Sequence, residues 1–360
     1  MKKIAILGAG NGGQALSGHL AMKGNDVRLY EHPAFAEKLD KIKAQGGIQL
    51  TGAIEGFGKL KASSKMEEVL KGAEVVYVVV PSFGQMPIMK EALPFLEDGM
   101  KFIFIPGNFG SLEATKLMKD NGTQAEVLLC ETDTLPYACR ADAPGKVHVW
   151  GLKKGMSIAA FSASRTVDLI REIQEVFPIP LHAAKNVLSI AFSNLNMIVH
   201  CAAVLLNAGR IEGTQGDFRF YTDGITPAVG RLEELLDAER VKVGDAYGLD
   251  LMPAVEWIKT AYPVEGETIY ELLSKNPVYA KHGSDAPKTV KHRYVTEDVP
   301  NLLVPVVNFA RAASIETPLT DSLITLLSAI NNDDYLGEGR NLARLGLEGL
   351  SKDEILKMIS

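Results

Sequence analysis

The sequence predicts a doubly wound α/β domain with a mostly parallel sheet, followed by an all-α domain. Short apolar runs alternate with helix-like segments through the first half of the chain. A glycine-rich turn follows the first of these runs, and beyond about residue 185 the apolar residues recur with the period of long helices. A chain of 360 residues is long enough for about two domains.

The strands of the first domain are predicted from continuous apolar runs, because parallel strands covered by helices on both faces lose the polar alternation. The run 3–7 and the mainly apolar segments 74–80, 102–105 and 125–129 are of this kind. A second short strand is predicted at 26–30, and strands near 147–150 and 156–161 are expected to extend the same sheet. A helix is predicted over 12–23. A later one begins at Ser164 as its N-cap and runs to Phe177, where two prolines end it.

The domain boundary is placed after this helix, which gives domains of 1–182 and 183–360. The hydrophobic period then predicts helices over 186–208, 226–247, 253–262, 268–275, 300–314 and 318–330. The second domain is therefore expected to be helical throughout.

Composition excludes several classes of protein. Hydrophobic residues make up 46% and charged residues 23%, as in soluble globular proteins, and the net charge of −6 disfavours a nucleic-acid partner. The three cysteines, Cys130, Cys139 and Cys201, contain no CxxC pair, so we expect no disulfide framework, no metal site and a reducing cytoplasm. No uninterrupted apolar stretch approaches the roughly 20 residues that cross a bilayer, so no membrane partner is expected.

The stretch Gly8-Ala9-Gly10-Asn11-Gly12-Gly13 satisfies the dinucleotide fingerprint GxGxxG and lies between a predicted strand and a predicted helix. Gly8 permits the tight turn, Gly10 lets the backbone approach a pyrophosphate, and Gly13 lets the helix pack closely on the strand. With Asn11, they are the predicted phosphate-binding residues at the helix N-terminus. The first domain is therefore predicted to be a Rossmann domain; the alternative is a glycine turn in an α/β protein that binds no nucleotide.

The second predicted strand leads into Glu31, about 20 residues past the glycines, where a carboxylate accepts hydrogen bonds from the adenosine ribose. That carboxylate would repel a 2′-phosphate and no arginine follows it, so NAD is preferred and NADP is the alternative. Pro81 ends the 74–80 run and would lie near the nicotinamide end if the usual strand order holds. A proline that simply stops a strand explains it equally well.

Candidate catalytic residues lie in the second half. Asn196 and His200 are four residues apart, which places them on one face of an otherwise apolar helix. A core histidine with a satisfied hydrogen bond is the alternative. In the segment 292–298, Arg293 could clamp a carboxylate and Asp298 could orient an imidazole. The alternative there is a solvated loop in which Asp298 caps a helix.

These residues resemble the opine dehydrogenase family, which includes octopine and nopaline dehydrogenases and a bacterial carboxyethyl-norvaline dehydrogenase. The resemblance spans nearly the whole chain. It is carried by the fingerprint, Pro106-Gly107-Asn108-Phe109-Gly110, Glu131-Thr132-Asp133-Thr134-Leu135-Pro136-Tyr137-Ala138-Cys139-Arg140, the pair Asn196 and His200, and His292-Arg293-Tyr294-Val295-Thr296-Glu297-Asp298. The last two are the specific ones, because ketopantoate and glycerol-phosphate dehydrogenases share the fingerprint.

The resemblance implies a reversible reductive condensation, in which an amino acid and a 2-oxo acid such as pyruvate form an imine that NAD(P)H reduces. By that resemblance His200 is the proton relay, Asp298 its paired carboxylate, and Arg293 the holder of the oxo acid carboxylate. Asn196 and Thr222 would be polar contacts, with Thr222 in a loop after the long helix. Small molecules are thus the expected partners, and a homodimer is one expectation for the assembly.

Three matters stay open in the sequence. Cys139 could line the substrate cleft, although a buried cysteine is more often plain packing. A ketopantoate-type reductase without an amine substrate, or a non-catalytic NAD-binding sensor, would show the same two-domain plan. The amino acid substrate is not specified, and we lean towards an apolar one.

Overall fold

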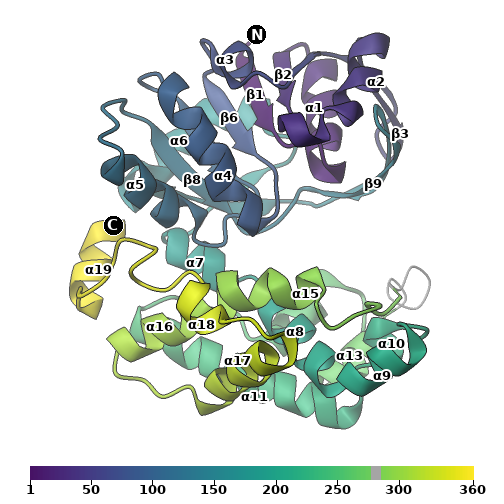
Figure 1. Cartoon of the computed structure of the whole chain (residues 1–360), viewed down its shortest axis with the longest axis vertical. Helices are drawn as coiled ribbons and strands as arrows, with labels where there is room; N and C mark the ends of the chain where they lie inside the picture. The colour runs from purple at the N-terminus through teal and green to yellow at the C-terminus, as the bar shows by residue number, and fades with distance from the viewer. Residues whose placement is uncertain (277–284) are drawn as a thin grey trace. The chain divides into compact units, whose positions relative to one another are not determined.

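The computed structural model describes residues 1–276 and 285–360, which form two compact units (Figure 1). The N-terminal unit comprises Met1–Ala191 with Met358–Ser360, and the helical unit comprises Phe192–Lys357. The boundary predicted after residue 182 falls inside a short strand, β12 (Leu181–Ala183), which pairs with β11 (Met156–Phe161). That pairing keeps residues 181–183 in the sheet of the N-terminal unit.

The main sheet of the N-terminal unit has eight strands in the order β12-β11-β8-β7-β6-β1-β2-β5. The remaining strands are β1 (Lys3–Leu7), β2 (Asp26–Tyr30), β5 (Lys61–Ser63), β6 (Val75–Val78), β7 (Lys101–Phe104) and β8 (Leu128–Thr132). All neighbours are parallel except β8 and β11. Since β1 lies between β2 and β6, the strand order reverses there, which is the switch point of a doubly wound sheet and confirms the predicted fold class.

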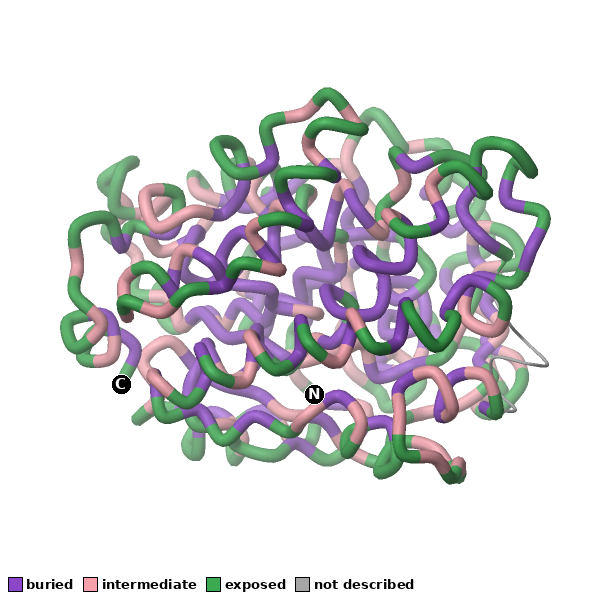
Figure 2. The backbone as a smooth tube through the Cα atoms, turned by 90° about the horizontal axis from the view of Figure 1, so that it is seen from below, coloured by how far each residue is buried: buried purple, intermediate pink, exposed green. Residues whose placement is uncertain are grey.

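Each face of this sheet has its own apolar core, because successive side chains of a strand point to opposite faces. Ile4 and Ile6 pack with α1 (Asn11–Met22) and α6 (Thr166–Ile173) on one face. Ala5 and Leu7 pack on the other face with α3 (Met66–Leu70), α4 (Ser82–Ala92) and α5 (Gly110–Asp120). Figure 2 shows the result as long buried stretches of backbone separated by exposed turns. Burial on both faces explains why β1, β6 and β7 are almost wholly apolar.

A second sheet was not predicted. It has the order β4-β3-β10-β9, with β3 (Gly47–Gly52), β4 (Gly56–Lys59), β9 (Tyr137–Ala143) and β10 (Lys146–Leu152). The strand expected near 147–150 belongs to this sheet rather than to the main one, because it pairs with β9 and β3. Its burial alternates, with Val147 and Val149 buried and Trp150 59% exposed, so only one face is covered. That covered face packs on α1, where Gly18 leaves room for Ile48 of β3.

Two other local predictions were wrong in detail. The strand expected at 125–129 is β8 at Leu128–Thr132. The helix expected from Ser164 to Phe177 is α6 with a short 3-10 turn at each end, and neither Ser162, before the first turn, nor Arg165, before α6, caps its helix with its side chain. The side chain of Ser164 bonds to that of Ser162 instead of capping a helix.

The helical unit confirms the predicted all-α domain, since every named element in its described part is a helix. These are α8 (Asn196–Leu206), α9 (Ala208–Thr214), α10 (Phe220–Asp223), α11 (Pro227–Ala246), α12 (Ala254–Ala261), α13 (Ile269–Ser274), α15 (Arg293–Thr296), the π-helical turn η5 (Val299–Leu303), α16 (Val304–Ala312), α17 (Pro318–Asn331), α18 (Tyr335–Glu338) and α19 (Lys352–Ile359). α2 (Glu37–Gln45) and all but the last residue of α7 (Val187–Phe192) belong to the N-terminal unit.

The helix predicted over 186–208 is divided into α7 and α8. The side chain of Asn194 accepts a hydrogen bond from the backbone N–H of Asn196 (3.1 Å), which begins α8 anew. By length and composition alone, the segment 187–206 could cross a membrane. However, 72% of the most apolar 18-residue window is buried inside the protein, as in a core helix.

Candidate active site

The glycine turn has the shape that a dinucleotide phosphate requires. Gly8 has φ +112°, and a Cβ there would lie 2.6 Å from the carbonyl oxygen of Val79. A Cβ on Gly13 would lie 1.8 Å from the carbonyl oxygen of Gly8, so the start of α1 packs directly on the turn. A Cβ on Gly10, in contrast, would meet nothing within 4 Å. Gly8 and Gly13 are therefore needed for packing, while Gly10 faces the open space that a phosphate would fill.

Glu31, directly after β2, is tied to this turn. Its carboxylate accepts hydrogen bonds from the backbone N–H of Ala9 (3.1 Å) and of His32 (3.1 Å), and the side chain is nearly buried. Lys38 lies 3.8 Å from the same carboxylate. A carboxylate has about four lone-pair positions, so acceptor capacity remains for ribose hydroxyls. The residues at the turn thus fit the adenosine half of NAD.

The two other predicted cofactor residues also lie at this edge of the sheet. The side-chain oxygen of Asn11 accepts a hydrogen bond from the backbone N–H of Ala141 in β9 (3.0 Å), so it anchors the second sheet to α1. The predicted contribution of Asn11 to phosphate binding therefore rests on its backbone. Pro81 precedes the first residue of α4 and follows Val79 and Val80, both of which would contact a Cβ on Gly8. β6 lies beside β1, which is the strand order on which the placement of Pro81 near the nicotinamide end depends; that placement stays a prediction.

In the helical unit, His200 of α8 and Asp298, just before η5, form a buried pair. The Nδ1 atom of His200 lies 2.7 Å from Oδ2 of Asp298, and the residues are 7% and 5% exposed. Burial raises the pKa of the Asp298 carboxyl, and the hydrogen bond and charge of His200 oppose that rise. Asp298 makes no side-chain cap to the helix that follows, which excludes the alternative of a solvated N-cap.

The other ring nitrogen of His200 contacts a residue that the sequence did not single out. Nε2 lies 3.0 Å from the hydroxyl of Tyr221 in α10. Tyr294 stacks on the imidazole, with ring centroids 3.9 Å apart and planes inclined by 19°. Because Asp298 accepts at Nδ1, the neutral ring carries its hydrogen there and accepts from Tyr221 at Nε2. The imidazole is thus fixed in position and tautomer.

The structure gives the remaining predicted catalytic residues, Thr222, Asn196 and Arg293, other partners or an exposed position. Thr222 lies in α10 rather than in a loop, and its hydroxyl donates to Asp223 (3.3 Å) rather than to the imidazole. Asn196 is exposed at the first position of α8, one turn before His200 on the same face. Arg293 begins α15 with its side chain 62% exposed, and its guanidinium lies 2.8 Å from the carboxylate of Glu297.

Cys139 lies in β9 of the N-terminal unit and packs against the apolar core there. Burial raises the pKa of its thiol to about 11, so it is a neutral packing group at ordinary pH. Neither it nor the other two cysteines forms a disulfide. Within residues 1–276 and 285–360, no three His, Cys, Asp or Glu side chains gather in a way that could hold a metal ion.

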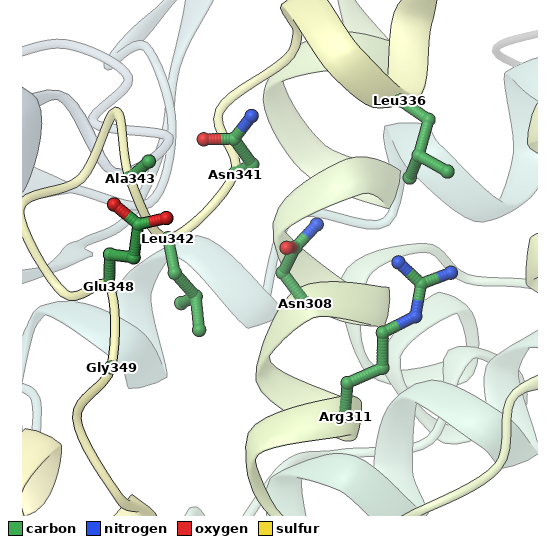
Figure 3. Close-up of a pocket in the computed structure, with 8 residues that line it drawn as sticks. All are labelled: Asn308, Arg311, Leu336, Asn341, Leu342, Ala343, Glu348 and Gly349. Carbon is green, nitrogen blue, oxygen red and sulfur yellow. The ribbon is translucent and has the colours of Figure 1, made fainter.

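A pocket of about 340 Å³ opens elsewhere on the helical unit (Figure 3). Asn308 and Arg311 of α16 line it together with Asn341 and Glu348 from the segment after α18. The Arg311 guanidinium is paired with Asp321 (2.6 Å). None of the predicted site residues is among those that line this pocket.

Comparison with known proteins finds matches in both units of the chain. Residues 183–331 match the family described as NAD/NADP octopine/nopaline dehydrogenase, alpha-helical domain, and residues 3–124 match the NAD-dependent glycerol-3-phosphate dehydrogenase N-terminus. An opine dehydrogenase of Arthrobacter sp. (strain 1C) is 35% identical over 97% of this chain and 96% of its own. An octopine dehydrogenase of Pecten maximus is 26% identical over 94% of this chain and 92% of its own.

A solved structure of octopine dehydrogenase with NADH and L-arginine shares the fold, with a TM-score of 0.81 and 24% identity over 99% of this chain and 98% of that one. A ketopantoate reductase from Ralstonia eutropha JMP134 is less similar, with a TM-score of 0.62 and 20% identity over 92% of this chain and 99% of that one. The chain therefore belongs to the opine dehydrogenase family and is an NAD-dependent oxidoreductase that acts on a carbon–nitrogen bond.

Proposed function

We propose that this enzyme joins an amino acid to a pyruvate-like 2-oxo acid by reductive condensation, with His200 as its acid and base. The single observation that carries the assignment of His200 is its buried bond to Asp298, which leaves Nε2 as the reactive nitrogen. Bound NADH supplies the hydride that reduces the imine. Octopine dehydrogenase has been solved with NADH and L-arginine and with NADH and pyruvate, which supports the substrate classes.

The proton chemistry follows from the imidazole. When the amine adds to the ketone, the carbonyl oxygen must leave as water, which needs two protons: the amine nitrogen gives up one as the carbinolamine forms, and an acid must supply the other. Protonated His200 donates that proton from Nε2, and in the reverse direction the neutral ring takes a proton from the attacking water. The Asp298 carboxylate, held 2.7 Å from Nδ1, stabilises the imidazolium that these steps require.

Tyr221 and Tyr294 position this imidazole. The Tyr221 hydroxyl contacts Nε2, the nitrogen that exchanges the proton, and so holds the ring on the side that a substrate oxygen would approach. Stacking on Tyr294 keeps the ring plane fixed while the proton moves. An orientation fixed in advance lowers the cost of reaching the reactive geometry.

Arg293 is the proposed clamp for the oxo acid carboxylate. A guanidinium has five N–H donors, so its bond to Glu297 leaves others for a bidentate pair with the substrate. Asn196, exposed one turn before His200, is a proposed polar contact. Thr222 has weaker support in that role, because its hydroxyl is bonded to Asp223. Cys139 is proposed to pack rather than to touch substrate, since it belongs to the apolar core of the N-terminal unit.

NADH oxidation with pyruvate, measured with and without a panel of L-amino acids, tests the proposal. Oxidation that depends on the amino acid is the expected result. Equally fast NADH oxidation with the oxo acid alone would instead identify a reductase of the ketopantoate type, whose fold this chain shares. Binding of NADH without any turnover would identify a sensor.

Three finer proposals accompany the reaction. We propose an apolar amino acid substrate, because Phe220, Tyr221 and Tyr294 surround the imidazole, and the panel ranks the side chains directly. We propose a cytoplasmic location, since the cysteines form no disulfide. We also propose that the cofactor is NAD in preference to NADP, because the Glu31 carboxylate lies at the glycine turn. The homodimer stays a prediction, which light scattering would test.

A further inference from the structure

Two segments have no role in the mechanism above: the loop Pro106–Gly110, which follows β7, and the motif that begins at Glu131 in β8. The structure brings them together. The Glu131 carboxylate is fully buried and accepts hydrogen bonds from the backbone N–H of Phe109 (3.1 Å) and of Ser111 (2.9 Å). The Ser111 hydroxyl donates to the same carboxylate (2.5 Å). Glu131 therefore caps the start of α5 from the neighbouring strand.

The carboxylate also dictates the shape of the loop. A Cβ on Gly107 would lie 2.1 Å from a Glu131 oxygen, so only glycine leaves room for this carboxylate. The next two residues, Asn108 and Phe109, both have left-handed backbones, with φ +53° and φ +68°. Non-glycine residues adopt this conformation at an energetic cost, and it persists only where the surroundings enforce it. The donors to Glu131, together with the N-terminal dipole of α5, supply that enforcement.

The loop is fixed on its other side to the helix after β6. The Gln85 amide donates to the carbonyl oxygens of Pro106 (2.8 Å) and Gly107 (3.2 Å), and the Asn108 amide donates to the Ser82 hydroxyl (2.9 Å). The loop thus connects the carboxyl ends of β6, β7 and β8. In a doubly wound sheet this half, beyond the switch point at β1, binds the second mononucleotide of the cofactor.

We infer that Glu131 is a positioning residue: through the loop Pro106–Gly110 it sets where the nicotinamide half of the cofactor binds. The inference rests on the proposed function, because the loop would hold the reacting half of the cofactor for reduction of the imine. It assigns a role to a residue that touches neither substrate nor cofactor.

Glu131→Gln tests the inference, because glutamine keeps the size but replaces one accepting oxygen by an NH₂ that faces N–H donors. We expect NADH binding to weaken at least about tenfold, the lower end of what one hydrogen bond to a charged group contributes. Binding of ADP-ribose, which lacks the nicotinamide, should stay within about twofold of the native protein, on the same conversion of energy to affinity. The kcat for NADH oxidation should fall, while the KM for the oxo acid stays the same.

Glu172→Gln is the matched control. Glu172 pairs with Lys101 (2.8 Å) at the amino end of β7, the strand whose other end leads into the loop Pro106–Gly110. The control should leave both affinities unchanged. Ser111→Ala removes the hydroxyl donor and keeps the backbone bond, so it should shift the same quantities by a smaller factor even if Glu131→Gln does not fold. Thermal unfolding reports whether each variant is folded.

Equal weakening of NADH and ADP-ribose would mean that Glu131 only stabilises the fold, and unchanged NADH binding would mean that the loop does not meet the nicotinamide half. Either result overturns the inference. The two binding measurements need no substrate. If the native protein showed no amine-dependent turnover, the proposed function would fail while these measurements still decided the role of Glu131.

Discussion

Replacing Asp298 by asparagine keeps the shape of the buried pair and removes its charge. The carboxylate lies 2.7 Å from Nδ1 of His200, and both side chains are nearly buried, so bulk water cannot substitute for it. A hydrogen bond to a charged group contributes about 1.5–3 kcal/mol. If the imidazolium loses that stabilisation in the transition state, kcat falls about 10- to 150-fold.

The asparagine amide adds a second effect in the same direction. Its NH₂ can donate to Nδ1, which moves the ring hydrogen to Nε2 and removes the lone pair that accepts the proton. The assay is steady-state NADH oxidation with pyruvate and an amino acid, accompanied by NADH binding measured by fluorescence. NADH affinity should not change, because the glycine turn and Glu31 belong to the N-terminal unit. Asp321→Asn, at an exposed ion pair, is the matched control and should leave kcat unchanged. A kcat for Asp298→Asn within about threefold of the native value would refute the role given to the pair.

Three further predictions concern the oxo acid, the phosphate cradle and the helical core. Arg293→Ala should raise the KM for the oxo acid at least about tenfold without affecting NADH binding, whereas the same change at the exposed Arg311 should do neither; equal effects would remove the clamp. Gly10→Ala should fold normally and bind NADH weakly, because its methyl group would enter the open space proposed for the phosphate. Gly13→Ala should lower the unfolding temperature, because its Cβ would meet the Gly8 carbonyl. Normal NADH binding by Gly10→Ala together with normal stability of Gly13→Ala would contradict the fit to a phosphate. Burial, and to a smaller extent the charge of Glu234, raises the pKa of the Glu233 carboxyl well above 4.5. The stability that the neutral carboxyl gives the folded protein is therefore fully present below about pH 4.5 and is lost as pH rises through the folded pKa. Glu233→Gln should unfold at a higher temperature than the native protein at pH 9 and at the same temperature near pH 4; identical unfolding curves for the two proteins at both pH values would refute the prediction.

The main sheet could be predicted from the sequence because its strands carry a local signal. The run at 74–80 is apolar after Glu74, since β6 packs on both faces. The second sheet carries no such signal: Gln49 of β3 pairs with Lys146 of β10, a contact between distant segments, and β4 has glycine at alternate positions. Pairing between distant strands depends on the assembled fold, which a single sequence does not display.

The candidate site was predictable in part. His200 and Asp298 were singled out from spacing and resemblance, and the structure brings them into contact, while their chemical roles stay predictions. Tyr221 was missed because nothing in a four-residue helix such as α10 distinguishes it from Thr222 beside it. A chemical signal did exist: a buried imidazole has two ring nitrogens, and Asp298 satisfies only one of them. A second partner that can donate to the other ring nitrogen, such as a hydroxyl, should therefore be sought for such a histidine.

Mass spectrometry of the product formed from pyruvate, an L-amino acid and NADH deuterated at the transferring position is the most direct measurement. Reductive condensation predicts a secondary amine dicarboxylate whose deuterium lies on the carbon newly bonded to nitrogen. Deuterium found only in a 2-hydroxy acid, with the amino acid recovered unchanged, would contradict the account.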